Sequence, residues 1–147
     1  MDNRIGSFMS KFNTQELNIY ENYSWTWSLN PQHNTLGASI LSGKRFNEKF
    51  SDITEKEGVE FMEMIRIIES TINKSFNYDK INYLMLMMID PHLHFHVIPR
   101  YKTLRLFAGD KWTDHGWPTM PKFSLEDTDL VILREIRDEL RKNLMIK

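Results

Sequence analysis

The stretch Asp90–Arg100, DPHLHFHVIPR, carries three of the five histidines in the chain, and they stand at every second position as His92, His94 and His96. Side chains two residues apart on a β-strand project from the same face, so this spacing predicts a strand with three imidazoles in a row. The opposite face would pack into the core through three apolar residues, Leu93, Phe95 and Val97. Aliphatic side chains suit a strand better than imidazole does, so the row indicates a site for chemistry rather than for packing.

Two kinds of chemistry fit a row of imidazoles. In the first, the histidines bind a metal ion, but His92 and His96 would lie ~13 Å apart, so a further ligand such as Asp90 or His115 would be needed. In the second, one imidazole nitrogen attacks phosphorus to form a covalent intermediate, while its neighbours bind phosphoryl oxygens or move the proton of the leaving group. We favour the second reaction, which requires neither a metal nor a cofactor.

The composition is that of one globular domain. The chain has 147 residues, of which 41% are hydrophobic and 27% charged, with 19 basic and 20 acidic side chains. The balanced charge provides no basic surface for nucleic acid, and the absence of cysteine excludes disulfides, thiolate zinc sites and cysteine nucleophiles. No apolar run approaches the ~20 residues that span a bilayer, and the first residues lack the apolar stretch of a signal peptide. We therefore expect a single domain over residues 1–147 that is cytoplasmic, with no membrane or nucleic-acid partner.

Periodic patterns predict the elements that precede the histidine row. Residues 5–12 have apolar side chains at helical spacing. Residues 23–30 alternate as a half-buried strand, and residues 35–43 form a second strand that would pair with it as a hairpin. A helix over residues 54–74 begins at TEKE, a capping-box pattern. The stripe expected to be buried on that helix is Phe61, Ile65, Ile68 and Ile72.

The remaining elements surround the row and follow it. Residues 81–89 are apolar almost throughout, which predicts a central strand covered on both faces and antiparallel to the histidine strand. Residues 102–122 lack a clear period and are interpreted as an irregular loop. A C-terminal helix over about residues 124–144 would begin at Ser124. Its apolar stripe is Leu133, Ile136, Leu140 and Leu144.

The segment from Tyr23 to Tyr101 resembles the histidine triad (HIT) family of nucleotide hydrolases and transferases. HLHFHVI is similar to the family signature, in which three histidines alternate with apolar residues. It also follows LNPQHNTLGASILSGKR, a helix with an acidic start and an apolar strand, as the family pattern requires. The resemblance implies an α+β, HIT-like fold with an antiparallel sheet of about five strands, a crossing central helix and a homodimeric assembly.

The resemblance also implies a reaction and roles for residues. The enzyme would cleave a nucleoside 5′-monophosphate, from an adenine or guanine nucleotide conjugate, away from an amine, acyl or nucleotide leaving group. By position, His94 would be the nucleophile that becomes nucleotidylated, and His96 would contact the phosphate oxygens or the leaving group. His92 would orient the row. Asn30 stands where the family commonly has an acid near the ribose, and its amide can hydrogen-bond a hydroxyl.

Several positions depart from the family pattern. Ala38 stands where many members have a further histidine, and Phe46 ends a segment that usually ends in histidine. Met88 and Ile89 occupy the turn before the triad, where polar groups usually face the phosphate. These departures leave open an alternative function, a HIT-like module that binds a nucleotide with little turnover.

Three further residues are candidates for substrate binding. Arg100 follows the triad and would bind phosphate through a bidentate fork. Trp112 would stack on a base, and His115 lies close to it in the same aromatic segment. The alternative for this segment is a loop anchored by its tryptophans, with Arg100 simply solvated.

Overall fold

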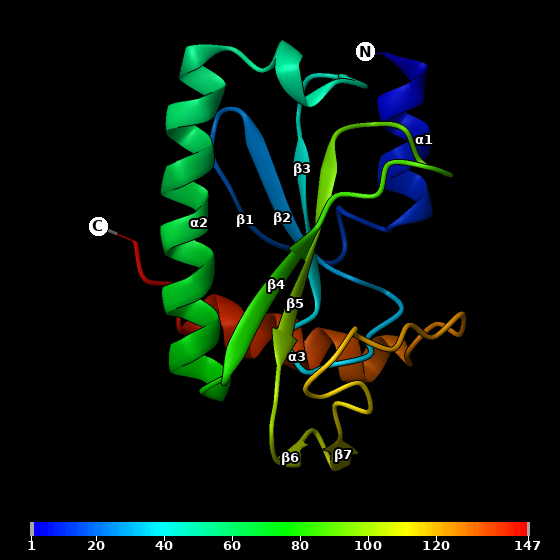
Figure 1. Ribbon diagram of the computed structural model, residues 1–147, viewed down its shortest axis with the longest axis vertical. Helices are drawn as coiled ribbons and strands as arrows, with labels where there is room; N and C mark the ends of the chain where they lie inside the picture. The colour runs from blue at the N-terminus through cyan, green and yellow to red at the C-terminus, as the bar shows by residue number, and fades with distance from the viewer. Residues whose placement is uncertain (1, 147) are drawn as a thin grey trace.

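The computed structural model describes residues 2–146 and consists of a five-stranded sheet with helices on both faces (Figure 1). The sheet strands are β1 (Asn18–Glu21), β2 (Trp25–Leu29), β3 (Ser39–Gly43), β4 (Lys80–Leu84) and β5 (His94–Arg100). A separate hairpin contains β6 (Arg105–Phe107) and β7 (Asp110–Trp112). The helices are α1 (Asn3–Lys11), α2 (Glu55–Phe76) and α3 (Leu130–Lys142), with a 3₁₀ turn at Phe50–Asp52.

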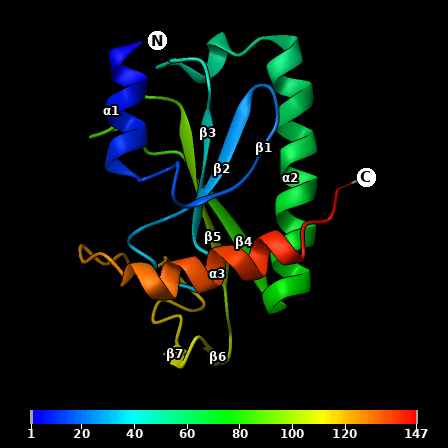
Figure 2. The same cartoon turned by 180° about the vertical axis from the view of Figure 1, so that it is seen from behind.

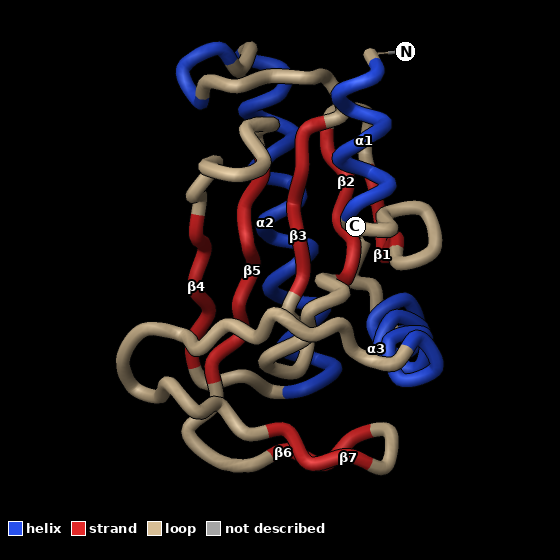
Figure 3. The backbone as a smooth tube through the Cα atoms, turned by 90° about the vertical axis from the view of Figure 1, so that its right-hand side faces the viewer, coloured by secondary structure: helices blue, strands red, loops and turns tan. Residues whose placement is uncertain are grey.

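The five strands are antiparallel throughout and run in the order β1-β2-β3-β5-β4. The long helix α2 covers one face of the sheet and α1 lies against the other, while α3 crosses near the lower end of the sheet (Figures 2 and 3). This arrangement confirms the predicted α+β class. It also confirms the hairpin predicted between residues 23–30 and 35–43, because β2 pairs with β3. Among residues 2–146, no helix combines the length and the apolar character needed to cross a membrane.

The core lies between the sheet and α2. Trp25, Trp27 and Leu29 on β2 are buried to 1% exposure or less. Leu93, Phe95 and Val97 also enter the core, as the alternation of the histidine stretch predicts. Tyr23 is the exception on the predicted strand face, because β2 begins only at Trp25 and the Tyr23 side chain is 76% exposed.

Helix α2 follows its sequence signals closely. The Thr54 side chain accepts a hydrogen bond from the Glu57 backbone N–H, and the Glu57 carboxylate accepts one from the Thr54 N–H, which completes the capping box. The predicted stripe faces the core, with Ile68 and Ile72 fully buried. Gly37, at φ +91°, lies under this helix, where a Cβ would stand 3.3 Å from the Ile72 side chain.

The strand predicted over residues 81–89 is confirmed in its first part and in its antiparallel pairing with the histidine strand, because β4 pairs with β5 and ends at Leu84. The predicted central position is wrong, since β4 lies at the edge of the sheet formed by the described residues. Residues 85–93 form a connecting loop in which Met88 and Ile89 are 84% and 87% exposed. An apolar run without a period does not distinguish a buried strand from an exposed loop, which is why the sequence misled here.

Two predictions for the last third of the chain also need correction. The segment 102–122 contains the β6–β7 hairpin, whose turn residues Ala108 and Gly109 both have positive φ. Helix α3 begins at Leu130 rather than near Ser124, because the Asp129 carboxylate caps it by accepting a hydrogen bond from the Val131 N–H.

Candidate active site

Strand β5 places His94 and His96 on the sheet face that α1 approaches. Their ring centroids are 5.2 Å apart, and the rings lie edge to face. His92 is not part of the strand, because β5 begins at His94. The predicted same-face row is therefore formed by two strand residues, with His92 in the loop that leads into them.

Two hydrogen bonds determine the state of His92. Its Nε2–H donates to the Gly43 carbonyl oxygen at 2.6 Å, and its Nδ1 accepts from the Asn47 backbone N–H at 3.3 Å. One nitrogen donates and the other accepts, so the ring is held as the neutral Nε2–H tautomer. Burial also lowers the pKa of His92 below its ordinary value. With both nitrogens occupied, His92 acts as a positioning group.

His94 has the opposite tautomer. Its Nδ1–H donates to the carbonyl oxygen of His92 at 2.6 Å, which leaves the lone pair of Nε2 available. The side chain is buried, and this burial lowers the pKa of His94, which favours the neutral imidazole. A neutral imidazole with a free Nε2 is the form of histidine that acts as a nucleophile.

His96 is the least satisfied of the three histidines. Its Nδ1 is buried and has no hydrogen-bond partner among residues 2–146. Burial lowers the pKa of His96 to about 4; repulsion from His94 in its protonated form adds to this effect, whereas Asp90 opposes it. A neutral ring with an unpartnered nitrogen beside His94 is suited to bind a group brought by a ligand.

Aromatic side chains from other parts of the chain enclose these rings. Phe8 on α1 lies 5.0 Å from the ring of His92 and 5.1 Å from that of His94, and Phe12 lies 6.0 Å from His94. His94 is only 2% exposed, and these two phenylalanine rings form part of what covers it. Two more rings complete the enclosure, Phe46 stacked on His92 and Phe123 beside His96.

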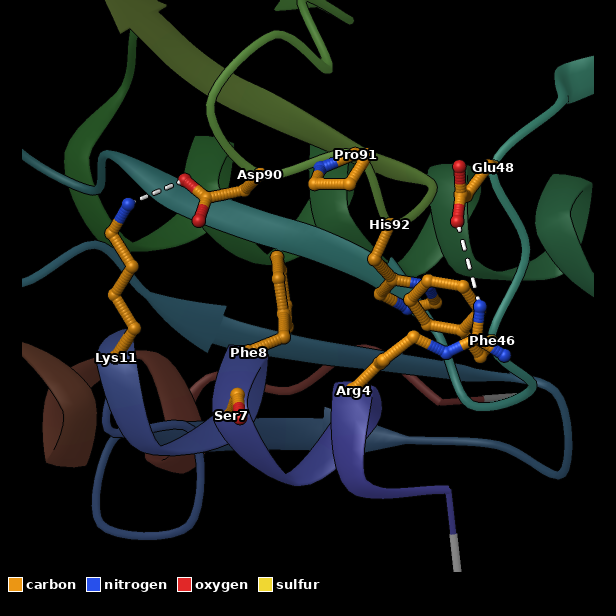
Figure 4. A pocket seen from close by; sticks show the side chains of 9 residues that line it. All are labelled: Arg4, Ser7, Phe8, Lys11, Phe46, Glu48, Asp90, Pro91 and His92. Carbon is orange, nitrogen blue, oxygen red and sulfur yellow. Dashed lines mark hydrogen bonds and ion pairs between the residues drawn. The ribbon is translucent and has the colours of Figure 1, made fainter.

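A cavity of about 300 Å³ lies next to His92, between α1 and the loops at residues 46–48 and 90–92 (Figure 4). Opposite charges meet at its two ends. Lys11 pairs with Asp90 at 2.6 Å at one end, and Arg4 approaches Glu48 at 3.6 Å at the other. The cavity therefore has two cations from one helix and two carboxylates from the loops facing them.

The structure places Arg100 away from the histidine rings. Its Nε and Nη2 donate to the Asp114 carboxylate and its Nη1 donates to the Asn82 side-chain oxygen. The side chains of Arg100 and Asp114 are 5% and 0% exposed, so the guanidinium is committed to a buried ion pair. We therefore remove Arg100 from the set of candidate phosphate ligands.

The other candidate residues occupy different places. Trp112 is buried, donates its indole N–H to the Phe107 carbonyl oxygen and contacts the buried His33, so it stabilises the hairpin segment. His115 is exposed and lines a second cavity of about 200 Å³ together with Phe123. Asn30 follows β2, and its side-chain oxygen accepts a hydrogen bond from the Gln32 N–H. None of these three forms a hydrogen bond with the histidine rings.

Sequence reasoning missed the contribution of α1. The apolar spacing of residues 5–12 predicts the helix, but it does not show that Phe8, Phe12 and Lys11 lie over residues 90–94. Within residues 2–146 no group of three or more histidine, aspartate or glutamate side chains is arranged to hold a metal ion. The side chains that α1 brings to His94 are thus aromatic, and Lys11 is the cation beside them.

Comparison with known proteins gives a match to one family model and several solved structures of similar fold. Residues 37–103 match the HIT domain model, whereas a search of curated protein sequences found no match. The fold is similar to a hypothetical histidine triad nucleotide-binding protein from Sulfolobus tokodaii strain 7, with a TM-score of 0.68 and 19% identity over 93% of this chain and 90% of that one. A Hit-like protein involved in cell-cycle regulation from Bartonella henselae gives a TM-score of 0.67 and 18% identity over 87% and 86% of the two chains. A histidine triad (HIT) protein from Sinorhizobium meliloti 1021 gives a TM-score of 0.66 and 19% identity over 92% of this chain and 99% of that one.

Proposed function

Since residues 37–103 carry a HIT domain, as the resemblance of the histidine row predicts, we propose that this protein is a nucleotide hydrolase or nucleotidyl transferase. It would cleave a nucleoside 5′-monophosphate from an amine, acyl or nucleotide leaving group. The observation that supports this reaction best is the hydrogen bond from His94 Nδ1–H to the His92 carbonyl oxygen, because it leaves Nε2 of a neutral imidazole free to attack.

The reaction has two displacements at the same phosphorus. In the first, His94 Nε2 forms a bond to phosphorus while the bond to the leaving group breaks, giving a covalent His94–nucleotide intermediate. In the second, water or another acceptor attacks phosphorus, the N–P bond breaks and the nucleotide is released. His96, beside His94, would hydrogen-bond a phosphoryl oxygen or the departing group. Neither step uses a metal or a cofactor.

The roles outside the histidine row remain predictions. Asn30 would bind the ribose, and His115 would contact the part of the substrate that reaches the cavity it shares with Phe123. Trp112 would act indirectly by holding that segment in place. A homodimer stays a prediction from the resemblance.

A second candidate function is nucleotide binding with little turnover. The observation that favours it is the burial of His94 beneath Phe8 and Phe12, combined with the exposed apolar turn at Met88 and Ile89. A protein of this kind would bind the nucleotide without bringing its phosphorus within reach of Nε2.

Incubation with adenosine or guanosine 5′-phosphoramidate tests the proposal. We expect release of the nucleoside monophosphate and a covalent nucleotide adduct detectable by mass spectrometry. In the His94→Ala variant the adduct should be lost and kcat should fall by at least about 10³-fold, while thermal unfolding confirms that the variant is folded. Equal turnover by His94→Ala would overturn the assigned nucleophile. Nucleotide binding by calorimetry without any turnover would instead support the second function.

A further inference from the structure

The loop before the histidine row contains little that can bind a phosphate. The Met88 and Ile89 side chains are apolar and point into solvent, and Pro91 has no backbone N–H. Asp90 is a carboxylate, which repels a phosphate oxygen. A phosphoryl group at His94 nevertheless needs a cation or aligned hydrogen-bond donors to stabilise its charge.

Helix α1 brings a cation to this position. Lys11 lies one residue before Phe12 and three after Phe8, the two side chains that contact the His94 ring. Its Nζ is 2.6 Å from the Asp90 carboxylate, so it reaches the loop that leads into the row (Figure 4). Burial is the main cause of the lowered pKa of His94; the charge of Asp90 opposes this shift and the charge of Lys11 adds to it, so both members of the ion pair act on the ring. Arg4, the other cation of the cavity, lies two helical turns away, where Asp2 and Glu48 occupy it.

The Lys11 ammonium can exchange its partner Asp90 for a phosphate. The Lys11 side chain is 49% exposed and that of Asp90 is 23% exposed. A partly exposed lysine–carboxylate pair contributes little net stability, because solvent screens it and both side chains lose rotamer freedom. A phosphate presents more charge and more acceptor oxygens to the same ammonium group.

We propose that Lys11 is a substrate-binding residue that holds the phosphate of the nucleotide at His94, and that Asp90 holds the Lys11 ammonium when no phosphate is present. The ligand class is a nucleoside 5′-monophosphate or its conjugate, so this inference rests on the proposed function. On this account α1 is part of the binding site, and it supplies the positive charge that the Met88–Ile89 turn lacks.

The proposal predicts effects of opposite sign for the two partners of one ion pair. Loss of the Lys11 charge removes a ligand of the phosphate and weakens binding. Loss of the Asp90 charge frees Lys11 and removes a repelling carboxylate, so binding becomes stronger. If the pair only attached α1 to the loop, both substitutions would break the same tether and would act in the same direction.

Calorimetry with AMP and with adenosine, repeated with GMP and guanosine, tests this prediction on the full chain. Lys11→Met should raise the Kd for the monophosphate by about ten- to hundredfold and leave the Kd for the nucleoside unchanged. Asp90→Asn should lower the Kd for the monophosphate by about two- to tenfold. Lys11→Arg, which keeps the charge, should retain most of the affinity. Lys142→Met, which removes a lysine paired with Glu139 on α3, is the matched control and should change neither Kd.

Three results would overturn the inference: equal monophosphate affinity in Lys11→Met and the unaltered protein, parallel loss of affinity in Lys11→Met and Asp90→Asn, or no monophosphate binding at all. Circular dichroism of each variant shows whether the total helix content and the fold are retained. The outcome is separable from that of the proposed function. Monophosphate binding that depends on Lys11 in a protein without turnover supports this inference and contradicts the hydrolase, whereas turnover that is insensitive to Lys11 does the reverse.

Discussion

The carbonyl oxygen of His92 accepts a hydrogen bond from the Nδ1–H of His94 at 2.6 Å, while the His92 ring donates from its other nitrogen, Nε2, to Gly43. Two histidines separated by one residue are therefore held in opposite tautomers. Hydrogen bonds to its side chain hold the ring of His92 in place. The backbone carbonyl of His92 in turn holds the ring of His94. Only the second ring is left with a free Nε2.

This relationship predicts the nitrogen spectrum of the imidazoles. Above about pH 6.5, ¹⁵N–¹H correlation of the ring nitrogens should show His94 protonated at Nδ1 and His92 protonated at Nε2. His94→Ala and His92→Ala assign the signals. A His94 ring protonated at Nε2 would contradict the geometry and remove the argument for nucleophilic attack from that atom.

The buried histidines predict a loss of stability in mild acid. Burial lowers the pKa of His33 and of His96 from 6.5 to about 4. The fold therefore favours their neutral forms, so this stability is fully present above about pH 6.5 and is lost as the pH falls toward about 4. The free energy of unfolding in urea should be lower at about pH 5 than at about pH 7.5. An unchanged value between these two pH conditions would contradict the prediction.

The ion pair of Arg100 and Asp114 predicts a structural rather than a catalytic phenotype. Arg100→Met leaves the Asp114 carboxylate buried without its partner, which should lower the free energy of unfolding by about 3–5 kcal/mol. Chemical denaturation measures this change. If Arg100 instead bound the substrate, the variant would keep its stability and lose affinity for AMP.

Substitution of two glycines by alanine should change the free energy of unfolding in opposite directions. Gly37→Ala should lower the free energy of unfolding by about 1–3 kcal/mol, because φ is +91° and the new Cβ would stand 3.3 Å from both Ile72 and Pro99. Gly58→Ala, in α2, should raise it by about 0.5–1 kcal/mol, since among the described residues no atom beyond the adjacent residues and the helix's own backbone lies within 4 Å of that Cβ, and alanine favours a helix. Thermal unfolding distinguishes the two, and a stabilised Gly37→Ala variant would contradict the close packing described here.

The sequence predicts elements well where a period or a cap defines them. The capping box begins α2 at the expected residue, and the alternation around Phe95 places it in the core. The apolar run at residues 81–89 predicted too long a strand and a central position, because hydrophobicity without a period defines neither the end of a strand nor its burial. The hairpin near Gly109 was missed because its turn lacks the Asn-Gly or Asp-Gly signal.

In the candidate site, too, local patterns predict some features and miss others. The spacing of His94 and His96 predicts their common face, because that depends only on local strand geometry. The contacts from Phe8 and Lys11 depend on how a distant helix packs, which no local pattern contains. Arg100 was misplaced for the same reason, since its partner Asp114 lies fourteen residues along the chain in a segment without a period.

The segment that matches the HIT domain, residues 37–103, contains the histidines, but Phe8, Phe12 and Phe123, which enclose them, lie outside it. Phe46, which stacks on His92, lies inside the matched segment, so part of the enclosure is encoded with the reacting groups and the rest is encoded elsewhere in the chain. Ligand selectivity can therefore be redesigned by grafting a different first helix or a different segment around Phe123, with every residue of the histidine strand left in place.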